Sequence, residues 1–472
     1  MPIRHFILTG LALMFLALPV KAQEVVVSAK APACDKVEKR FMFRVQLKDK
    51  KNNPYSLKKP QEFLSQKAID RRKRYKLKVD RYDLPISPAY INELTGLGLS
   101  VHNKSKWNNT VVVNTTDTTL MEKVRQLPFV QSVRLVWIGP DSVVQTKSID
   151  RKSLVSSTFK PLKHYYGHSR KQIEMLGVDR LHDAGYKGEG MTIAVLDGGF
   201  YNVDVIPFFD HSKILGTRNF VQPEVNVYDE PNHGMMVLSC IAGKAPNGII
   251  GTAPEAFFYL LQTEDGRSEQ LVEEDNYCAA LEYADSLGCD IVTASLGYYK
   301  FDHDFMNHSY ADLNGKTAVN SRADSLAASR GILLLNSAGN EGDNTWKKIG
   351  FPADAKDILT VGAVYADSTN TEFSSLGYTA DGRIKPDAMA VGASSAVFTN
   401  AGTPGRANGT SFSCPILCGA VACLWQAHRD KSPKQIIEMV HQVGSFYNAP
   451  NEVYGYGIPN LWKAHQDFQY KK

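Results

Sequence analysis

The sequence predicts an α/β protein with a mostly parallel central sheet flanked by helices, preceded by a small α+β domain. The first indication is a set of apolar runs that end in polar residues and glycines, at 191–197, 290–297 and 331–340. Such runs are typical of strands buried on both faces of a parallel sheet. The second is the apolar, small-residue segment that follows Ser411, a pattern typical of a helix packed closely on all sides. The third is a strand and helix pattern between residues 41 and 136.

The beginning of the chain has the pattern of a secretory signal peptide. Residues 1–22 carry Arg4, continue as an apolar run over 6–20 and end in Ala22. This run is too short for a transmembrane helix, so we expect cleavage after Ala22 and an extracytoplasmic protein, whether periplasmic, surface-bound or released. Another cleavage point or an uncleaved anchor are the alternatives. No other run of about 18 apolar residues occurs, so no membrane span is expected in the mature form.

Residues 23–140 are predicted to form the α+β domain. The expected elements are a strand at 41–47, a helix at 60–72, a strand at 111–114, a helix at 118–127 and a strand at 130–136. This order suggests one small antiparallel sheet. Residues 141–165 are polar and are predicted to be a linker and processing region, and residues 166–467 the α/β domain.

Charge is distributed unevenly along the chain. Residues 23–160 contain 27 Lys and Arg against 13 Asp and Glu, whereas residues 161–472 contain 25 against 36. This asymmetry favours association of the two parts. The basic run at 70–78 could be a nucleic-acid patch, but no groove-reading motif surrounds it. We interpret it as the solvent-exposed face of a helix and expect no nucleic-acid partner.

Ser411 follows Gly409 and Thr410, so it lies where a loop ends and a helix begins. The free N–H groups and the field at a helix N-terminus favour negative charge, which suits a nucleophile whose transition state is an oxyanion. An isolated serine at such a position is more often a helix cap. Pro415 is expected in the first turn of this helix, where a missing N–H costs little.

Two further residues supply what a serine nucleophile needs, a base and a carboxylate that orients the base. The strand at 191–197 ends in Asp197, and carboxyl ends of strands are where active sites of open α/β sheets gather. His233 stands just ahead of an apolar, small-residue helix. The chain order Asp197, His233, Ser411 excludes an α/β-hydrolase, in which the serine comes first and the histidine last.

These segments resemble those of the subtilisin-like serine peptidases, the subtilases. Asn408, Gly409, Thr410 and Ser411, followed by Pro415, match the serine segment of that family, and the resemblance spans roughly residues 165–465. It implies a secreted serine endopeptidase of bacterial type, made as a zymogen. The chain departs from the family where Gly198 replaces a Ser or Thr and Met235 replaces a Thr. Both positions support the triad, so the departures bear on fine geometry more than on the reaction class.

The resemblance also implies the role of each residue. Asp197, His233 and Ser411 would form the triad, and Asn340 would donate a hydrogen bond to the oxyanion beside the N–H of Ser411. A further segment matches the substrate-binding strand, where an extended peptide pairs backbone to backbone. It consists of Ser295, Leu296 and Gly297.

The expected partners are polypeptide substrates and the chain's own propeptide, since residues 23–140 resemble a bacterial subtilase propeptide that acts as an intramolecular inhibitor. The triad chemistry requires no cofactor. No acid-rich loop with ligand spacing occurs, so no metal ligand is predicted and structural calcium stays undecided. The alternative function is a catalytically silent or permanently masked binding protein on the same fold, against which the intact Asp, His, Asn and Ser argue.

Seven cysteines occur, and four of them lie among small apolar residues on the two helices that follow His233 and Ser411. They are predicted to be buried packing residues rather than a disulfide framework. Cys414 and Cys418 have helical i, i+4 spacing, but no second pair accompanies them to bind a metal.

Overall fold

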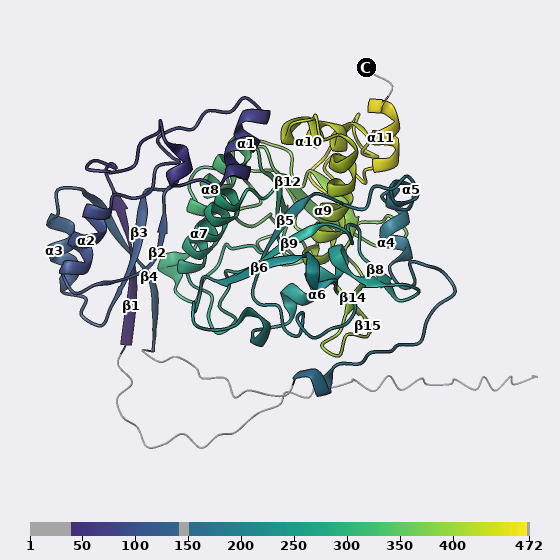
Figure 1. The fold of residues 1–472 in the computed structure, drawn as a ribbon, viewed down its shortest axis with the longest axis horizontal. Coiled ribbons are helices and arrows are strands. Elements are labelled where there is room, and N and C mark those ends of the chain that lie inside the picture. The colour runs from purple at the N-terminus through teal and green to yellow at the C-terminus, as the bar shows by residue number, and fades with distance from the viewer. Residues whose placement is uncertain (1–38, 141–150, 470–472) are drawn as a thin grey trace, which may run out of the picture. The chain divides into compact units, whose positions relative to one another are not determined.

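A computed structural model describes residues 39–140 and 151–469, which form a four-stranded sheet domain followed by a larger α/β domain (Figure 1). The expected signal peptide, Cys34 and the first ten residues of the expected linker lie outside the described residues.

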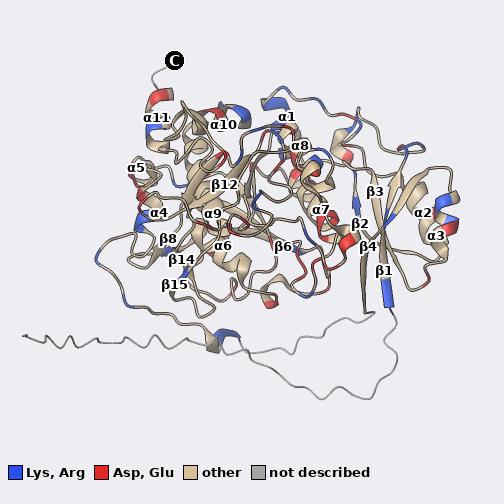
Figure 2. Ribbon diagram, turned by 180° about the vertical axis from the view of Figure 1, so that it is seen from behind, with Lys and Arg blue, Asp and Glu red and all other residues tan. Residues whose placement is uncertain are grey.

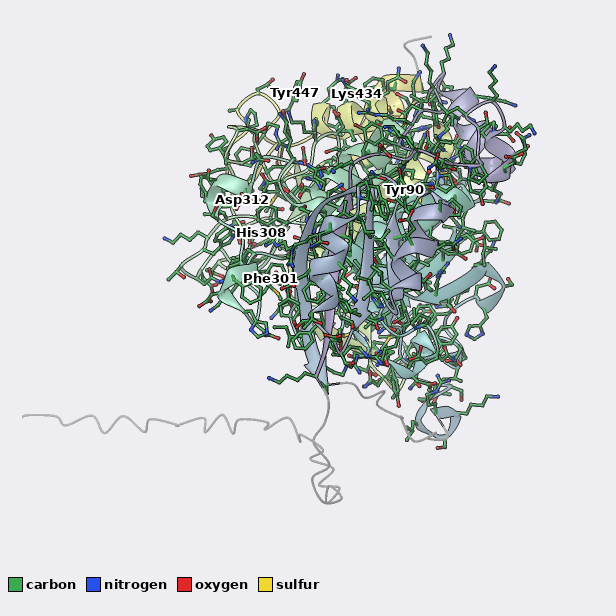
Figure 3. The ribbon with its side chains drawn as sticks, turned by 90° about the vertical axis from the view of Figure 1, so that its left-hand side faces the viewer. Tyr90, Phe301, His308, Asp312, Lys434 and Tyr447 are labelled. Atoms are coloured by element: carbon green, nitrogen blue, oxygen red, sulfur yellow. The ribbon has the colours of Figure 1, made fainter. Side chains whose placement is uncertain are left out.

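The N-terminal domain is a single antiparallel sheet covered by two helices; the antiparallel sheet was predicted, but only one of these two helices was. Its strand order is β2-β3-β1-β4, and Val45 of β1 pairs with Val111 of β3 on one side and Val133 of β4 on the other. The elements are β1 (Lys39–Leu47), α2 (Pro88–Gly96), β2 (Ser100–Ser105), β3 (Thr110–Thr115), α3 (Leu120–Gln126) and β4 (Val130–Pro140). Neither α2 nor β2 was predicted from the sequence. Tyr90 of α2 stacks on Phe129 at 4.1 Å between ring centroids, which holds α2 on the sheet (Figure 3).

Between β1 and α2 the predicted helix at 60–72 is broken in two. A short 3-10 turn, η1 (Pro60–Glu62), is followed by α1 (Gln66–Arg74), because the side chain of Ser65 caps α1 by accepting the N–H of Ala68 at 3.2 Å. The prediction that the basic run at 70–78 is exposed to solvent is wrong for Arg71 and Arg72, whose side chains are buried with 4% and 1% exposure.

The larger domain contains a seven-stranded parallel sheet of order β13-β12-β11-β10-β5-β9-β6. The strands are β5 (Thr192–Asp197), β6 (Ile214–Asn219), β9 (Phe257–Gln262), β10 (Ile291–Ala294), β11 (Leu333–Ser337), β12 (Leu359–Val364) and β13 (Ala388–Val391). Ala294 at the end of β10 lies level with Leu196 of β5 and Asn336 of β11. The residues that follow these three strands therefore emerge at the same edge of the sheet.

Helices cover both faces of this sheet (Figure 1). One face of the sheet packs against α6 and α9, and the other face packs against α7 and α8. The helices of this domain are α4 (Arg170–Glu174), α5 (Val178–Asp183), α6 (His233–Ala242), α7 (Val272–Leu287), α8 (Val319–Ser329), α9 (Thr410–Ala427), α10 (Pro433–Gln442) and α11 (Leu461–Gln469). Short strand pairs join β7 (Lys244–Ala245) to β8 (Ile249–Ile250) and β14 (Ser395–Phe398) to β15 (Pro404–Ala407).

Helix α9 is long and apolar enough to cross a membrane by composition, but it is mostly buried as a core helix of the α/β domain. The six cysteines within the described ranges are free and buried, which confirms the predicted packing role of the four on α6 and α9.

The two domains share a charged and an apolar contact. The buried Arg44 of β1 makes two 2.7 Å hydrogen bonds to the carboxylate of Asp275 on α7, as the opposite charges of the two parts of the chain led us to expect. Figure 2 shows acidic stretches along α7 and basic ones on α1. Phe301 packs with Val112 and Val136 of the N-terminal sheet, and Figure 3 shows it beside His308 near these strands. The described residues thus pack as one unit.

Candidate active site

Asp197 and His233 are hydrogen-bonded as the sequence predicted. Asp197 ends β5 and is 0% exposed, and His233 begins α6, with its Nδ1 2.8 Å from Oδ1 of Asp197. Gly234 permits this approach, because a Cβ there would lie 2.4 Å from the carbonyl oxygen of Gly199 and 2.9 Å from the Cβ of Asp197. The histidine therefore has its Nδ1 occupied and its other ring nitrogen available.

The surroundings raise the pKa of His233. Burial by itself lowers that pKa, but the charge of Asp197 and its hydrogen bond outweigh burial, with a smaller contribution from Glu264. Oδ1 of Asp197 also accepts the N–H of Gly198 at 2.7 Å, whereas Oδ2 is buried and has no hydrogen-bond partner among the residues that the structure describes. The pair is thus arranged to stabilise a protonated imidazole.

Ser411 is the second residue of α9 and is 9% exposed. Gly409 before the helix has φ 145° and ψ 153°, a conformation that essentially only glycine adopts. The Ser411 hydroxyl donates to the carbonyl of Ser295 at 3.4 Å, and no hydrogen bond joins it to His233 in the described part of the chain. The ring centroid of His233 lies 5.9 Å from that of Phe412, the residue that follows Ser411. Catalytic hydrogen bonds are often long before substrate binds.

Pro415 lies in the second turn of α9, not in the first as predicted, because the helix already begins at Thr410. A proline there removes the N–H that would bond to the carbonyl of Ser411. Oγ of Ser295 donates to that carbonyl instead, at 2.8 Å. The start of α9 is therefore tied to the end of β10 by a bond that the proline makes possible.

Asn340 presents its amide N–H groups freely. Its Oδ1 accepts a hydrogen bond from the backbone N–H of Thr410 at 2.8 Å. This bond fixes the orientation of the amide and leaves Nδ2 without a part in it. Within the described ranges, neither Nδ2 of Asn340 nor the backbone N–H of Ser411 has an acceptor. A Cβ at Gly409 would lie 3.6 Å from Nδ2, so the amide is next to the start of α9. Two donors therefore lie close together beside the serine.

The segment Ser295, Leu296 and Gly297 leaves β10 next to Ser411. A Cβ at the exposed Gly297 would meet nothing within 4 Å. The carbonyl of Leu296 accepts a hydrogen bond from Nδ2 of Asn336 at 3.0 Å. The backbone N–H and carbonyl of Tyr298 both form hydrogen bonds with the backbone of Phe351, at 2.9 Å each. The space beside the backbone of Gly297 is thus open.

β4, the last strand of the N-terminal domain, is hydrogen-bonded through its main chain to the side chain of Gln270 in the α/β domain. The N–H of Ile138 donates to Oε1 of Gln270 at 2.8 Å, and Nε2 of Gln270 donates to the Ile138 carbonyl at 2.9 Å. Gln270 lies in the loop between β9 and α7.

Glu264, which follows β9 and lies near His233, was not predicted from the sequence. Oε1 of this carboxyl accepts hydrogen bonds from the hydroxyls of Tyr298 and Thr263. Burial, reinforced by the charge of Glu269, raises the pKa of Glu264 to about 8. A carboxylate within two residues of the end of a buried apolar strand was the signal that could have identified it.

No group of three or more His, Cys, Asp or Glu residues that could hold a metal ion occurs within residues 39–140 and 151–469.

Comparisons with known proteins agree with this architecture. A model of the subtilase family, Peptidase S8, matches residues 188–457, and a model of the Peptidase S8 propeptide domain of Bacteroidota matches residues 42–152. Subtilisin NAT from Bacillus subtilis subsp. natto is 28% identical over 313 residues, which cover 65% of this chain and 74% of that protein. Subtilisin from Bacillus pumilus is 28% identical over 301 residues, or 62% of this chain and 98% of that protein.

Among solved structures, the crystal structure of MycP1 with the N-terminal propeptide removed has a TM-score of 0.49 and 20% sequence identity. It covers 62% of this chain and 96% of the MycP1 chain.

The subtilase model covers more than half of the chain and contains every residue of the candidate site, while the propeptide model covers the N-terminal sheet. The chain therefore belongs to the subtilase family, as a serine endopeptidase with an N-terminal propeptide domain.

Proposed function

We propose that the protein hydrolyses peptide bonds with Ser411 as nucleophile, His233 as general base and Asp197 as the group that orients the histidine. His233 takes the proton of the attacking hydroxyl and later donates it to the leaving amine. The observation that carries the proposal is the 2.8 Å bond between Nδ1 of His233 and the buried Asp197, which leaves the other ring nitrogen for the serine.

Nδ2 of Asn340 and the N–H of Ser411 form the oxyanion hole in this proposal. Both are donors without a described acceptor, and Thr410 holds the Asn340 amide in place by its N–H. Donors fixed before the reaction stabilise the charge that develops on the substrate carbonyl oxygen without reorganising.

The substrate is a polypeptide in extended conformation along Ser295, Leu296 and Gly297. The open space at Gly297 supports this position, because main-chain pairing requires close approach. Such pairing reads no side chains, so any sequence preference arises in neighbouring pockets.

The chain is made as a zymogen whose propeptide inhibits the catalytic domain, and it acts outside the cytoplasm. The bonds between Ile138 and Gln270 support inhibition, because they hold the end of β4 against the loop that precedes α7. Cleavage between β4 and the catalytic domain would separate this strand from the enzyme's own chain.

A fluorophosphonate probe tests the proposal, because it labels only an activated serine. The processed wild-type chain should be labelled, Ser411→Ala should not, and Ser413→Ala should react like the wild type. Labelling that persists in Ser411→Ala would assign the nucleophile elsewhere. Absence of labelling in the wild type, even after the linker is cut, would favour a silent or permanently masked binding protein.

A further inference from the structure

Residues 151–162, here called the strap, belong to the predicted linker but are bound to the α/β domain. The strap begins with a short 3-10 helix, η2 (Arg151–Leu154), and in Figure 1 it runs below β15 and turns toward α4. The N–H of Ser156 donates to the carbonyl of Ala401 at 2.8 Å, and Phe159 packs against the main core of that domain. The strap therefore takes its order from the α/β domain.

Arg151, the first residue of the strap, binds two separate loops of the α/β domain. Its guanidinium makes two hydrogen bonds to the carboxylate of Asp204, at 2.5 and 2.9 Å. It also donates to the carbonyl of Tyr228 at 3.2 Å, and its Nε lies 2.9 Å from Oδ1 of Asp229. Only 16% of the Arg151 side chain is exposed. All three nitrogens of the guanidinium are thus used at once, which the single ammonium of a lysine could not reproduce.

The two loops are the ones that flank the Asp197 and His233 pair. Asp204 lies in the loop that follows Asp197 at the end of β5. Asp229 ends η4 (Val227–Asp229), a short 3-10 helix in the loop that leads to His233. Because Arg151 binds both loops, it restrains the segments on which the 2.8 Å bond between Asp197 and His233 depends.

The two loops approach each other so closely that a small shift of either would reach the site. The N–H of Phe200 donates to the carbonyl of Val227 at 2.8 Å. A Cβ at Gly199 would lie 2.6 Å from the Cβ of Glu230, and one at Gly234 would lie 2.4 Å from the carbonyl oxygen of Gly199. Gly234 directly follows the histidine, so a displacement of either loop changes the position of the imidazole.

We propose that Arg151 is a positioning residue for catalysis that acts through the Asp197 and His233 pair and stays in the mature enzyme. The propeptide model includes Arg151, since it extends to residue 152, but the contacts of its side chain join it to the catalytic domain. The carboxylates of Asp204 and Asp229 are 30% and 40% exposed, and ion pairs at such positions add little to stability. Their main effect is therefore on geometry. This inference rests on the proposed function of the triad.

The test compares kcat and KM of the wild type with those of Arg151→Gln on a peptide substrate. An added endopeptidase cuts all chains alike at a recognition sequence placed within residues 141–150, and fluorophosphonate labelling counts the active serines. Per labelled serine, Arg151→Gln should lower kcat about 10-fold or more with KM little changed, because a small misplacement of a catalytic group slows the reaction steeply.

Two further variants accompany this comparison. Arg151→Lys keeps the charge but can hold only one carboxylate, so it should recover part of the loss in kcat. Lys152→Gln removes the same charge from an exposed position of η2 and is the matched control, which should behave like the wild type. N-terminal sequencing of the wild type without the added recognition sequence should find Arg151 in the active, processed chain.

Two results would overturn the proposal. One is an unchanged kcat in Arg151→Gln, whether or not KM rises, and the other is an active wild type whose first residue lies after Arg151. If Arg151→Gln gives no labelled chain, Asp229→Asn, which removes one of the two carboxylate partners, replaces it and should lower kcat to a smaller extent. A wild type that the probe does not label would overturn the proposed triad as well, whereas a labelled wild type with an unchanged Arg151→Gln would overturn this inference alone.

Discussion

The bond from Ser295 to the carbonyl of Ser411 predicts a coupling between Ser295 and Pro415. Removing the hydroxyl in Ser295→Ala leaves a buried carbonyl without a partner, because Pro415 has no N–H to offer. An unsatisfied buried acceptor costs about 1–3 kcal/mol, and we expect a loss of unfolding free energy in this range. Pro415→Ala restores the helical N–H that can bond to the same carbonyl, so Ser295→Ala should then cost little.

A double-mutant cycle in the Ser411→Ala chain measures this coupling by urea unfolding. The expected interaction energy between positions 295 and 415 is about 1–2 kcal/mol, and effects of proline on the unfolded chain cancel in the cycle. Ser413→Ala is the control, because the Ser413 hydroxyl bonds to the Thr410 carbonyl at 3.0 Å, which α9 itself can satisfy. Strictly additive effects at 295 and 415 would refute the reasoning.

Four other predictions concern the site and the buried contact between the two domains. Asn340→Ala should lower kcat by about 10²–10³-fold, a magnitude known from the related subtilisin, with KM little changed; a change in KM alone would make Asn340 a substrate-binding residue. Because catalysis needs neutral His233, whose pKa is raised above 6.5, kcat/KM should fall as the pH drops through that raised value, and Asp197→Asn should move this limb to lower pH. Glu264→Gln should remove an inflection near pH 8 from the same profile, since Glu264 ionises at about pH 8 beside the histidine; an unchanged profile would show that its charge does not reach the reaction. The pKa of Asp285 is lowered from 3.8 to about 2, so its contribution to the stability of the folded chain is complete above pH 4 and lost as the pH falls toward 2, which urea unfolding at stepwise pH can follow.

The sequence alone determined the class of fold and the candidate residues of the reaction centre. Asp197 could be placed because an apolar strand ends at it, Ser411 because Gly409 and Thr410 mark the start of a helix, and Asn340 through the resemblance to the subtilases. These signals are local, and parallel strands bring their carboxyl ends to one edge whatever the loops between them do. The antiparallel N-terminal sheet followed in the same way from alternation along 41–47 and 130–136.

Only the tertiary structure decided which polar groups meet across long separations in the chain. The burial of Arg71 depends on Asp285 and on carbonyls more than 200 residues away, so a basic run by itself indicates a solvated surface. The same holds for Ser295, whose hydroxyl donates to the carbonyl of Ser411. That carbonyl needs a donor because Pro415 lies in the second turn of α9 and not in the first, as the sequence had suggested. Pairing of buried polar groups is set by three-dimensional packing, and periodicity along the sequence carries no record of it.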